Sequence, residues 1–146
     1  MNVTIIHVGD FKEDYFRQAE KEYAKRLSAY CSFKTVLVKE EENLKKEAEK
    51  VLSLLPPKAK KIALCVEGKQ LSSEEFAVVL DEARFVSSEI CFVIGSSCGL
   101  DESVKRACDI RLSFSKMTLP HRLARILLEE QIYRAFTIIA GKTYHK

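Results

Sequence analysis

The sequence predicts an α/β fold in a single domain (residues 1–146), with a mostly parallel sheet covered by helices on both faces. Short apolar runs alternate with longer amphipathic stretches along the whole chain, an order typical of β-α-β units. One run, residues 90–94, is apolar without interruption, as expected of a central strand buried on both faces. With 146 residues, 47% of them hydrophobic, the chain can build one substantial core.

The first half of the chain predicts two strands and two helices. Residues 3–8 form an apolar run typical of a strand, and residues 33–38 alternate in polarity like a second one. Residues 13–30 place apolar side chains at helical spacing on one face, which predicts a helix. Residues 40–55 form a highly charged stretch that we expect to be helical, ended by the prolines from Pro56.

The middle of the chain continues the alternation. Residues 61–66 are apolar and predict a third strand, stopped by the polar residues that follow. Ser72 or Ser73 can cap the next helix, which we expect to run to about Phe85. The run at 90–94 is then the fourth strand. A short helix at 102–107 and a fifth strand at 110–114 follow, and Pro120 opens a final helix that ends near Gly141.

The final helix carries apolar residues on more than one face, including Leu123, Leu127, Ile132 and Phe136. A helix of this kind must be buried on two sides. The sheet can cover one side, and a second subunit in a C2 homodimer could cover the other. A central helix inside a monomer is the alternative. We expect the homodimer, because a C-terminal helix is seldom central in such a fold.

Positive charge is concentrated at the end of the chain. Residues 116–146 contain six Lys or Arg and two Glu, whereas the whole chain has a net charge of only +3. This distribution favours a localised anionic partner, with ordinary scatter of charge as the alternative.

Cysteine usage and hydropathy exclude several classes of protein. None of the five cysteines forms a C-x-x-C pair, and there are only three histidines, so we expect no metal site. No stretch approaches the roughly 20 apolar residues that span a bilayer. The odd number of cysteines and the absence of a secretory signal favour a reducing compartment. We therefore expect a cytoplasmic protein that does not bind membranes.

Three segments are candidates for a functional site. Loops at 95–100 and 115–120 follow expected parallel strands, whose carboxyl ends meet where open α/β sheets bind nucleotide-like ligands. Each loop alone could be a plain connector. The chain ends in Tyr144-His145-Lys146, a tail that either folds back over a site or frays. Arg134 is either catalytic or paired with Glu130 one helical turn away.

Together these segments resemble the ribosomal RNA large subunit methyltransferase H family, the small SPOUT-class enzymes. The resemblance covers nearly the whole chain and is most specific in four segments. These are Phe92-Val93-Ile94-Gly95, residues 112–121, residues 130–136 and Tyr144-His145. The family's familiar form after Ile94 is Gly-Gly, often followed by Pro. Here Gly95 keeps the first Gly, while Ser96 and Ser97 replace the other two residues.

The resemblance implies a C-terminal trefoil knot, a homodimer and S-adenosylmethionine as cofactor. It implies that the following positions bind the cofactor: Leu64, Gly95, Phe114, Ser115, Lys116, Met117, Thr118 and Leu119. The implied reaction is methylation of the imino ring nitrogen (N-3) of a pseudouridine in 23S ribosomal RNA, on assembled ribosomes.

Roles in this reaction are a hypothesis built on the resemblance. His145, or a water molecule that it holds, would assist deprotonation of the imino nitrogen. Arg134 would stabilise charge on the base's carbonyl oxygen, and Tyr144 would position the base. Phosphate contacts would come from Arg122, Arg125 and Lys146.

Two other functions fit the sequence. The first is a non-catalytic RNA-binding or ribosome-assembly protein that retains the knotted fold. The second is a small-molecule enzyme with a nucleotide cofactor on a flavodoxin-like sheet, against which the basic C-terminal end argues.

Overall fold

The computed structural model describes all 146 residues, in which five strands alternate with five helices. The elements are β1 (Asn2–Val8), α1 (Asp14–Leu27), β2 (Ser32–Val38), α2 (Leu44–Leu54), β3 (Lys60–Gln70), α3 (Ser73–Val86), β4 (Glu89–Ile94), α4 (Glu102–Ala107), β5 (Ile110–Ser113) and α5 (His121–Ile139). Each helix and strand predicted from the sequence is present, with bounds that differ by a few residues.

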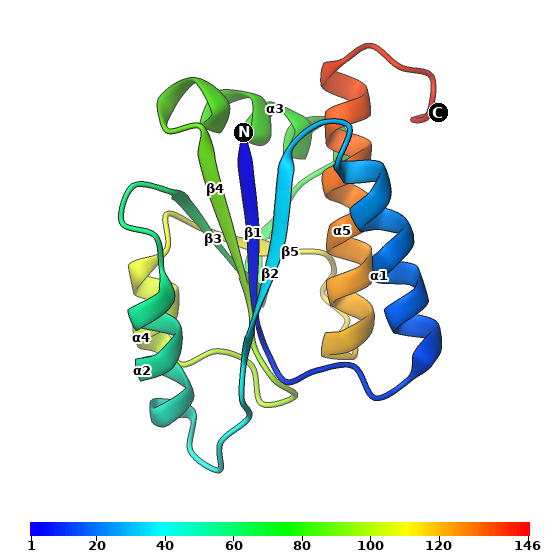
Figure 1. Cartoon of the computed structure of the whole chain (residues 1–146). Helices are drawn as coiled ribbons and strands as arrows, with labels where there is room; N and C mark the ends of the chain where they lie inside the picture. Colours follow the sequence, from blue (N-terminus) through cyan, green and yellow to red (C-terminus); the bar gives the residue numbers. More distant parts are fainter.

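The five strands form one sheet in the order β2-β1-β4-β3-β5, and every neighbouring pair is parallel. The uninterrupted apolar run is β4, which lies at the centre of the sheet with all but its first residue buried. The prediction of a mostly parallel α/β sheet is therefore confirmed. Because all strands point the same way, their carboxyl ends share one edge, the lower edge in Figure 1.

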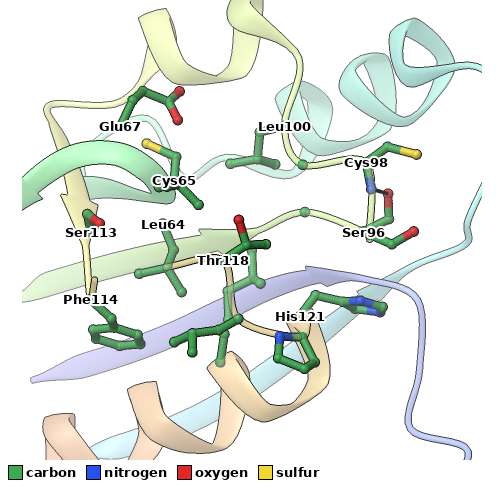
Figure 2. Close-up of a pocket in the computed structure, with 18 of the residues that line it drawn as sticks. Leu64, Cys65, Glu67, Ser96, Cys98, Leu100, Ser113, Phe114, Thr118 and His121 are labelled. Atoms are coloured by element: carbon green, nitrogen blue, oxygen red, sulfur yellow. Dashed lines mark hydrogen bonds between the residues drawn. The ribbon is translucent and has the colours of Figure 1, made fainter. Parts of the chain in front are cut away.

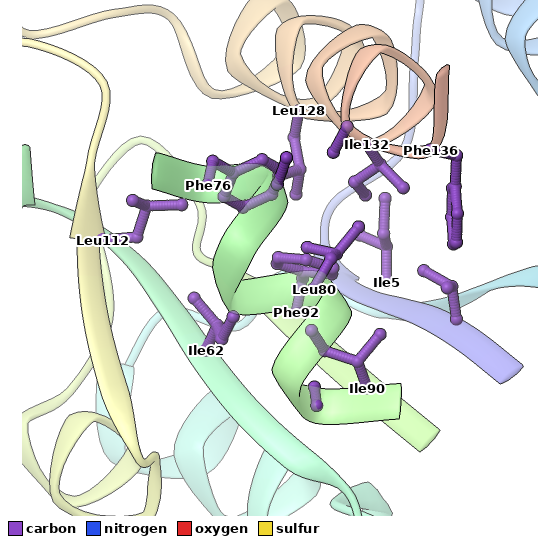
Figure 3. Close-up of a cluster of buried hydrophobic side chains, with 14 of the residues drawn as sticks. Ile5, Ile62, Phe76, Leu80, Ile90, Phe92, Leu112, Leu128, Ile132 and Phe136 are labelled. Atoms are coloured by element: carbon purple, nitrogen blue, oxygen red, sulfur yellow. The ribbon is translucent and has the colours of Figure 1, made fainter. Parts of the chain in front are cut away.

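Helices cover both faces of the sheet, as predicted. Helices α2 and α4 lie on one face, and α1, α3 and α5 lie on the other (Figure 1). Side chains alternate along each strand, so β1 contributes Val3 and Ile5 to the core under α3 and α5 and Ile6 and Val8 to the core under α2 and α4. Figure 3 shows the larger core, where Phe92 of β4 lies among residues of α3 and α5.

Helix α5 is the middle helix of its face, since it packs against both α1 and α3. The sequence argument for a homodimer treated α5 as an outer helix, and this premise is wrong. The chain itself covers most of the apolar surface of α5, with Ile132 fully buried and Phe136 nearly so. A partly exposed stripe remains that includes Leu123 and Leu127, each 37% exposed. The homodimer itself stays a prediction.

Strand β3 is longer than predicted. We expected it to stop before Glu67, but pairing with β5 resumes at Lys69 after a shift of register between Leu64 and Lys69. The residues between Leu64 and Lys69 have no ladder partner on β5. Gly68 makes this possible, because a Cβ atom there would lie 2.6 Å from the carbonyl carbon of Leu112. The shift brings Cys65 and Glu67 to the rim of a cavity at the sheet edge.

Candidate active site

A cavity of about 780 Å³ opens at the carboxyl edge of the sheet. Three segments line it: the end of β3, the loop after β4 and the loop that joins β5 to α5 (Figure 2). Of the eight positions predicted to bind a cofactor, seven line this cavity and come from all three segments. They are Leu64, Gly95, Phe114, Ser115, Met117, Thr118 and Leu119. Lys116 is exposed and does not line the cavity.

The loop after β4 is a tight turn in which Gly95 and Gly99 touch. The amide of Gly99 donates to the carbonyl of Ser96 at 2.9 Å, and Gly99 adopts a positive φ of 79°. A Cβ atom on Gly95 would lie 2.3 Å from the carbonyl oxygen of Gly99. Only glycine fits at position 95 in this shape, so the loop backbone itself forms a wall of the cavity.

The loop between β5 and α5 is held by its own serines. The hydroxyl of Ser113 donates to the carbonyl of Ser115 at 2.9 Å, and the hydroxyl of Ser115 accepts from the amide of Met117 at 3.0 Å. Met117 is 76% exposed, an unusual position for a large apolar side chain. Since apolar surface beside a cavity favours a ligand, this loop suits an aromatic or apolar group.

Charged side chains lie at the rim of the cavity. Glu67 is the only carboxylate among the lining residues, and it forms an ion pair with Lys105 of α4. The hydrogen bond from Lys105 lowers the pKa of Glu67. On the opposite side, Nε of Arg122 donates to the carbonyl of Asp10 at 3.0 Å. Burial, aided by Arg122, lowers the pKa of His121, so this imidazole is neutral at pH 7.

The chain's tail folds back onto α5 and gathers the three residues predicted to be catalytic. Nη1 of Arg134 lies 3.1 Å from Nδ1 of His145, and its guanidinium lies 4.9 Å from the ring centroid of Tyr144. Glu130 organises the group, because one oxygen accepts from Nη2 of Arg134 at 2.7 Å and from the Tyr144 hydroxyl at 3.2 Å. Arg134 is thus paired with Glu130, as the spacing allowed, and also contacts both tail residues.

These contacts fix the tautomer of His145. A guanidinium only donates hydrogen bonds, so Nδ1 of His145 accepts from Arg134. The proton then lies on Nε2, which donates to Glu74 of α3 at 2.7 Å. That hydrogen bond is the main reason that the pKa of Glu74 is lowered. Both ring nitrogens are therefore engaged, and Nδ1 is the one that carries a lone pair.

The cavity and the tail lie at opposite ends of α5. His121 lines the cavity at the start of the helix, whereas Arg134 lies 13 residues further along. At a rise of about 1.5 Å per residue this corresponds to roughly 20 Å. In Figure 1 the helix rises from the lower, carboxyl edge of the sheet to the tail at the top. None of the three tail-cluster residues lines the cavity.

Comparisons with known proteins show the family to which the chain belongs. A family model described as Predicted SPOUT methyltransferase matches residues 1–145. A ribosomal RNA large subunit methyltransferase H of Bacillus pumilus (strain SAFR-032) is 44% identical over 159 aligned positions that cover both chains completely. The protein of that name from Caldicellulosiruptor saccharolyticus is 46% identical over 153 positions, covering 99% of each chain. The chain belongs to this family of SPOUT methyltransferases.

Solved structures show that the fold is shared more widely. A protein solved in work on the 2-OH methylation of C/U34 on tRNA superposes with a TM-score of 0.57 at 17% identity, covering 97% of this chain and 98% of its own. The SpoU methyltransferase AviRb of Streptomyces viridochromogenes, solved in complex with AdoMet, gives a TM-score of 0.50 at 13% identity, with 98% and 59% covered. At these identities the likeness concerns the fold alone.

The prediction that Arg125 contacts a phosphate of the RNA is wrong. Arg125 is only 4% exposed and forms an ion pair with Glu20 of α1. Its guanidinium also lies 3.0 Å from Nδ1 of His7 and 4.0 Å from the ring centroid of Phe11. Arg125 therefore joins α5 to α1 and β1 and is not available to bind RNA. Arg122 is half-buried and Lys146 exposed, so both remain available.

Sequence reasoning missed the acidic partners of the tail and the charged pair at the cavity rim. Glu74 contacts His145 across 71 positions of sequence, and Lys105 reaches Glu67 across 38. No local sequence pattern predicts such pairs.

Two further findings concern metals and membranes. No group of three or more His, Cys, Asp or Glu side chains is arranged to hold a metal ion. None of the helices is long and apolar enough to cross a membrane.

Proposed function

We propose that this protein uses S-adenosylmethionine to methylate the imino ring nitrogen (N-3) of a pseudouridine in 23S ribosomal RNA, on assembled ribosomes. The observation that carries the proposal is the cavity, which gathers seven of eight predicted cofactor positions from three separate segments. Relatives named ribosomal RNA large subunit methyltransferase H match the chain over its full length. The trefoil knot implied by the family and the cytoplasmic location expected from cysteine usage are part of this proposal.

The cavity residues fit such a cofactor. Gly95 lets the loop close tightly, because a Cβ atom there would lie 2.3 Å from the carbonyl oxygen of Gly99, and the loop backbone then lines the cavity where a ligand can contact it. Phe114, Met117 and Leu119 offer apolar surface for an adenine ring, and the backbone of residues 115–118 offers amides and carbonyls to its edge. Glu67 and Arg122 stand at the rim, where they can meet charged or hydroxyl groups. The cofactor, when bound, supplies an electrophilic methyl group.

The tail cluster of Arg134, Tyr144 and His145 supplies groups for the RNA base. The target imino nitrogen must lose its proton, and the lone pair on Nδ1 of His145 can accept it directly or through water once Arg134 turns toward the base. Arg134 then stabilises the charge that develops on the neighbouring carbonyl oxygen. Tyr144 presents an aromatic ring against which a base can stack. Arg122 and Lys146 would contact phosphates.

A homodimer would bring the cavity and the tail cluster together. The partly exposed stripe of α5 includes Leu123, Leu127, Gln131 and Arg134, of which the last two are half-buried, and it runs from the cavity end of the helix to the tail end. If two copies pair antiparallel along this stripe by a C2 axis, the tail cluster of each comes beside the cavity of the other. The separation of roughly 20 Å within one chain is thus the reason, in this proposal, for a dimer.

The decisive experiment measures methyl transfer from labelled S-adenosylmethionine to ribosomes that lack the modification, with free 23S RNA alongside. We expect label at one pseudouridine of the ribosome and none on free RNA. Measurable cofactor binding without transfer to either substrate would overturn the proposed reaction and favour a non-catalytic RNA-binding protein.

Complementation between variants tests the shared site. A cavity variant, Gly95→Ala, and a tail variant, His145→Ala, should each be inactive as homodimers. A heterodimer has one intact cavity opposite one intact tail, so mixing the variants should recover up to a quarter of wild-type activity, since half of the dimers are mixed and each has one working site. No recovery, with mixed dimers verified by affinity tags, would show that each chain works alone.

A further inference from the structure

A buried carboxylate lies directly behind the loop that follows β4. Glu47 belongs to the first turn of α2 and is 4% exposed, and Ser96 in the loop is 7% exposed. The tip of the loop, residues 97–99, is exposed, whereas Gly95 and Leu100 at its two ends are buried. The contact between Glu47 and Ser96 therefore links the base of this exposed tip to α2.

Hydrogen bonds connect the two residues to the backbone on either side. The hydroxyl of Ser96 donates to Oε1 of Glu47 at 3.4 Å and accepts from the amide of Cys98 at 3.4 Å. The other oxygen of Glu47 accepts from the amide of Glu41 at 2.9 Å. A single carboxylate thus links the cavity loop to the segment that precedes α2.

This carboxylate has no role in packing that an apolar side chain could not fill. Its neighbours on α2, Ala48 and Val51, already cover the sheet on this face. Burying a carboxylate is costly unless hydrogen bonds compensate for lost hydration. The compensation here comes from Ser96 and the Glu41 amide, and the positive end of the α2 dipole adds to it.

We propose that Glu47 is a positioning residue for the S-adenosylmethionine site. It fixes the Ser96 hydroxyl and thereby the backbone of residues 95–98, which forms one wall of the cavity. In this chain Ser96 replaces a glycine of the family's familiar loop. Its hydrogen bond to Glu47 gives the serine side chain a structural role that a glycine could not have. The proposal rests on the proposed function, because it assumes that this cavity binds the cofactor.

Calorimetric titration of S-adenosylmethionine into wild type and four variants tests the proposal. Ser96→Ala and Glu47→Ala each break the contact and should raise the Kd about tenfold, the effect of losing one hydrogen bond to a charged group. Glu49→Ala and Lys50→Ala are controls at exposed positions of the same helix, away from the cavity, and should leave the Kd unchanged. The kcat at saturating cofactor should stay within about twofold of wild type for all four, because the loop only positions the ligand.

Two more variants separate positioning from general destabilisation. Glu47→Gln can still donate to Ser96 and accept from the Glu41 amide, so we expect a Kd within about threefold of wild type. The double variant Ser96→Ala/Glu47→Ala should bind about as weakly as either single variant, since both act through one contact. Circular dichroism at the assay temperature confirms that each variant is folded.

The outcomes distinguish failure of this inference from failure of the proposed function on which it rests. Wild type that fails to bind S-adenosylmethionine would overturn the proposed function and this inference with it. Wild type that binds, with Ser96→Ala indistinguishable from it in Kd, would overturn the inference alone, whatever Glu47→Ala does. Additive effects in the double variant would also overturn it.

Discussion

The two ends of α5 hold different kinds of chemistry. At its start, the cavity is built mainly from backbone and apolar side chains, with Gly95 and Met117 as examples. At its end, the tail cluster is built from paired side chains, where Glu130 holds both Arg134 and Tyr144. The first end is suited to binding a ligand in a largely preformed site, and the second is suited to proton transfer and charge stabilisation.

The middle of α5 joins these ends and contains buried ionisable side chains. Arg125 forms an ion pair with Glu20. Glu129 is completely buried beside them, and neither of its carboxyl oxygens has a hydrogen-bond partner. Burial first, and the neighbouring Glu20 second, raise the pKa of Glu129 to about 10, so this side chain is a neutral acid at pH 7. The contrast predicts that variants at the two ends alter function separately, whereas variants in the middle alter stability.

The largest effect should come from Gly95→Ala at the cavity end. The added Cβ atom would lie 2.3 Å from the carbonyl oxygen of Gly99, so the loop must change shape. We expect the Kd for S-adenosylmethionine to rise more than about 100-fold, as for removal of several ligand contacts at once. Calorimetric titration measures it, and Glu49→Ala, exposed and away from the cavity, serves as the control. Unchanged binding would place the cofactor elsewhere.

The next effect separates the tail end from the cavity. Arg134→Ala should lower kcat by about 10²–10³-fold, the usual size for loss of a group that stabilises developing charge. Because Arg134 does not line the cavity and is proposed to contact the RNA base, the Kd for S-adenosylmethionine measured without RNA should change less than about twofold. Arg134→Lys keeps the charge but loses the planar fork, so its kcat should fall in between. A large change in Kd with normal kcat would contradict the division between the two ends.

The sequence allowed the elements and the cavity to be predicted for a physical reason. Parallel strands place their carboxyl ends at one edge, so loops 95–100 and 115–120 had to meet. The spacing of Glu130 and Arg134 likewise allowed their ion pair to be foreseen. Features such as these depend on local sequence spacing and on strand direction, so they can be predicted without knowledge of contacts between distant segments.

Other features depend on contacts between distant segments and could not be foreseen. Arg122 and Arg125 look alike in the sequence, yet Arg125 is buried because Glu20 of α1 and His7 of β1 lie beside it. The central position of α5 follows from how α1 and α3 pack, which periodicity does not encode. The same holds for Glu74, which reaches the tail only through the fold.

A smaller effect should appear in the middle of α5, as a change in the pH dependence of stability. The pKa of Glu129 is raised from 4.5 to about 10 by burial, so the folded state binds this proton more tightly than the unfolded state. Its contribution is fully present below about 4.5 and is lost as pH rises toward about 10, with a limiting slope near 1.4 kcal/mol per pH unit. Glu129→Gln has no such proton to lose, so its stability relative to wild type should rise with pH by about 1.4 kcal/mol per pH unit.

Urea unfolding between pH 5 and 9 measures this difference. The gap in unfolding free energy between Glu129→Gln and wild type should widen as pH rises, while the exposed control Glu49→Gln should follow wild type throughout. A gap that stays constant with pH would mean that Glu129 is ionised in the folded state. Catalytic activity at pH 7 should be unaffected, since neither end of the helix depends on this proton.

The smallest effect should come from Lys146→Ala at the exposed tail. Lys146 makes no contact that holds the fold, so stability should be unchanged. If it meets one phosphate of the ribosomal RNA, its loss should weaken ribosome binding by a few-fold and lower the salt dependence by about one counterion. Filter binding of ribosomes at several salt concentrations measures both quantities.

Lys116→Ala, exposed at the other end of α5, tests whether the cavity end also contacts the RNA. An equal fall in salt slope for both variants would mean that RNA spans the two ends, as a dimer with a shared site requires. A fall for Lys116→Ala alone would move the RNA to the cavity end and remove the tail cluster from the reaction.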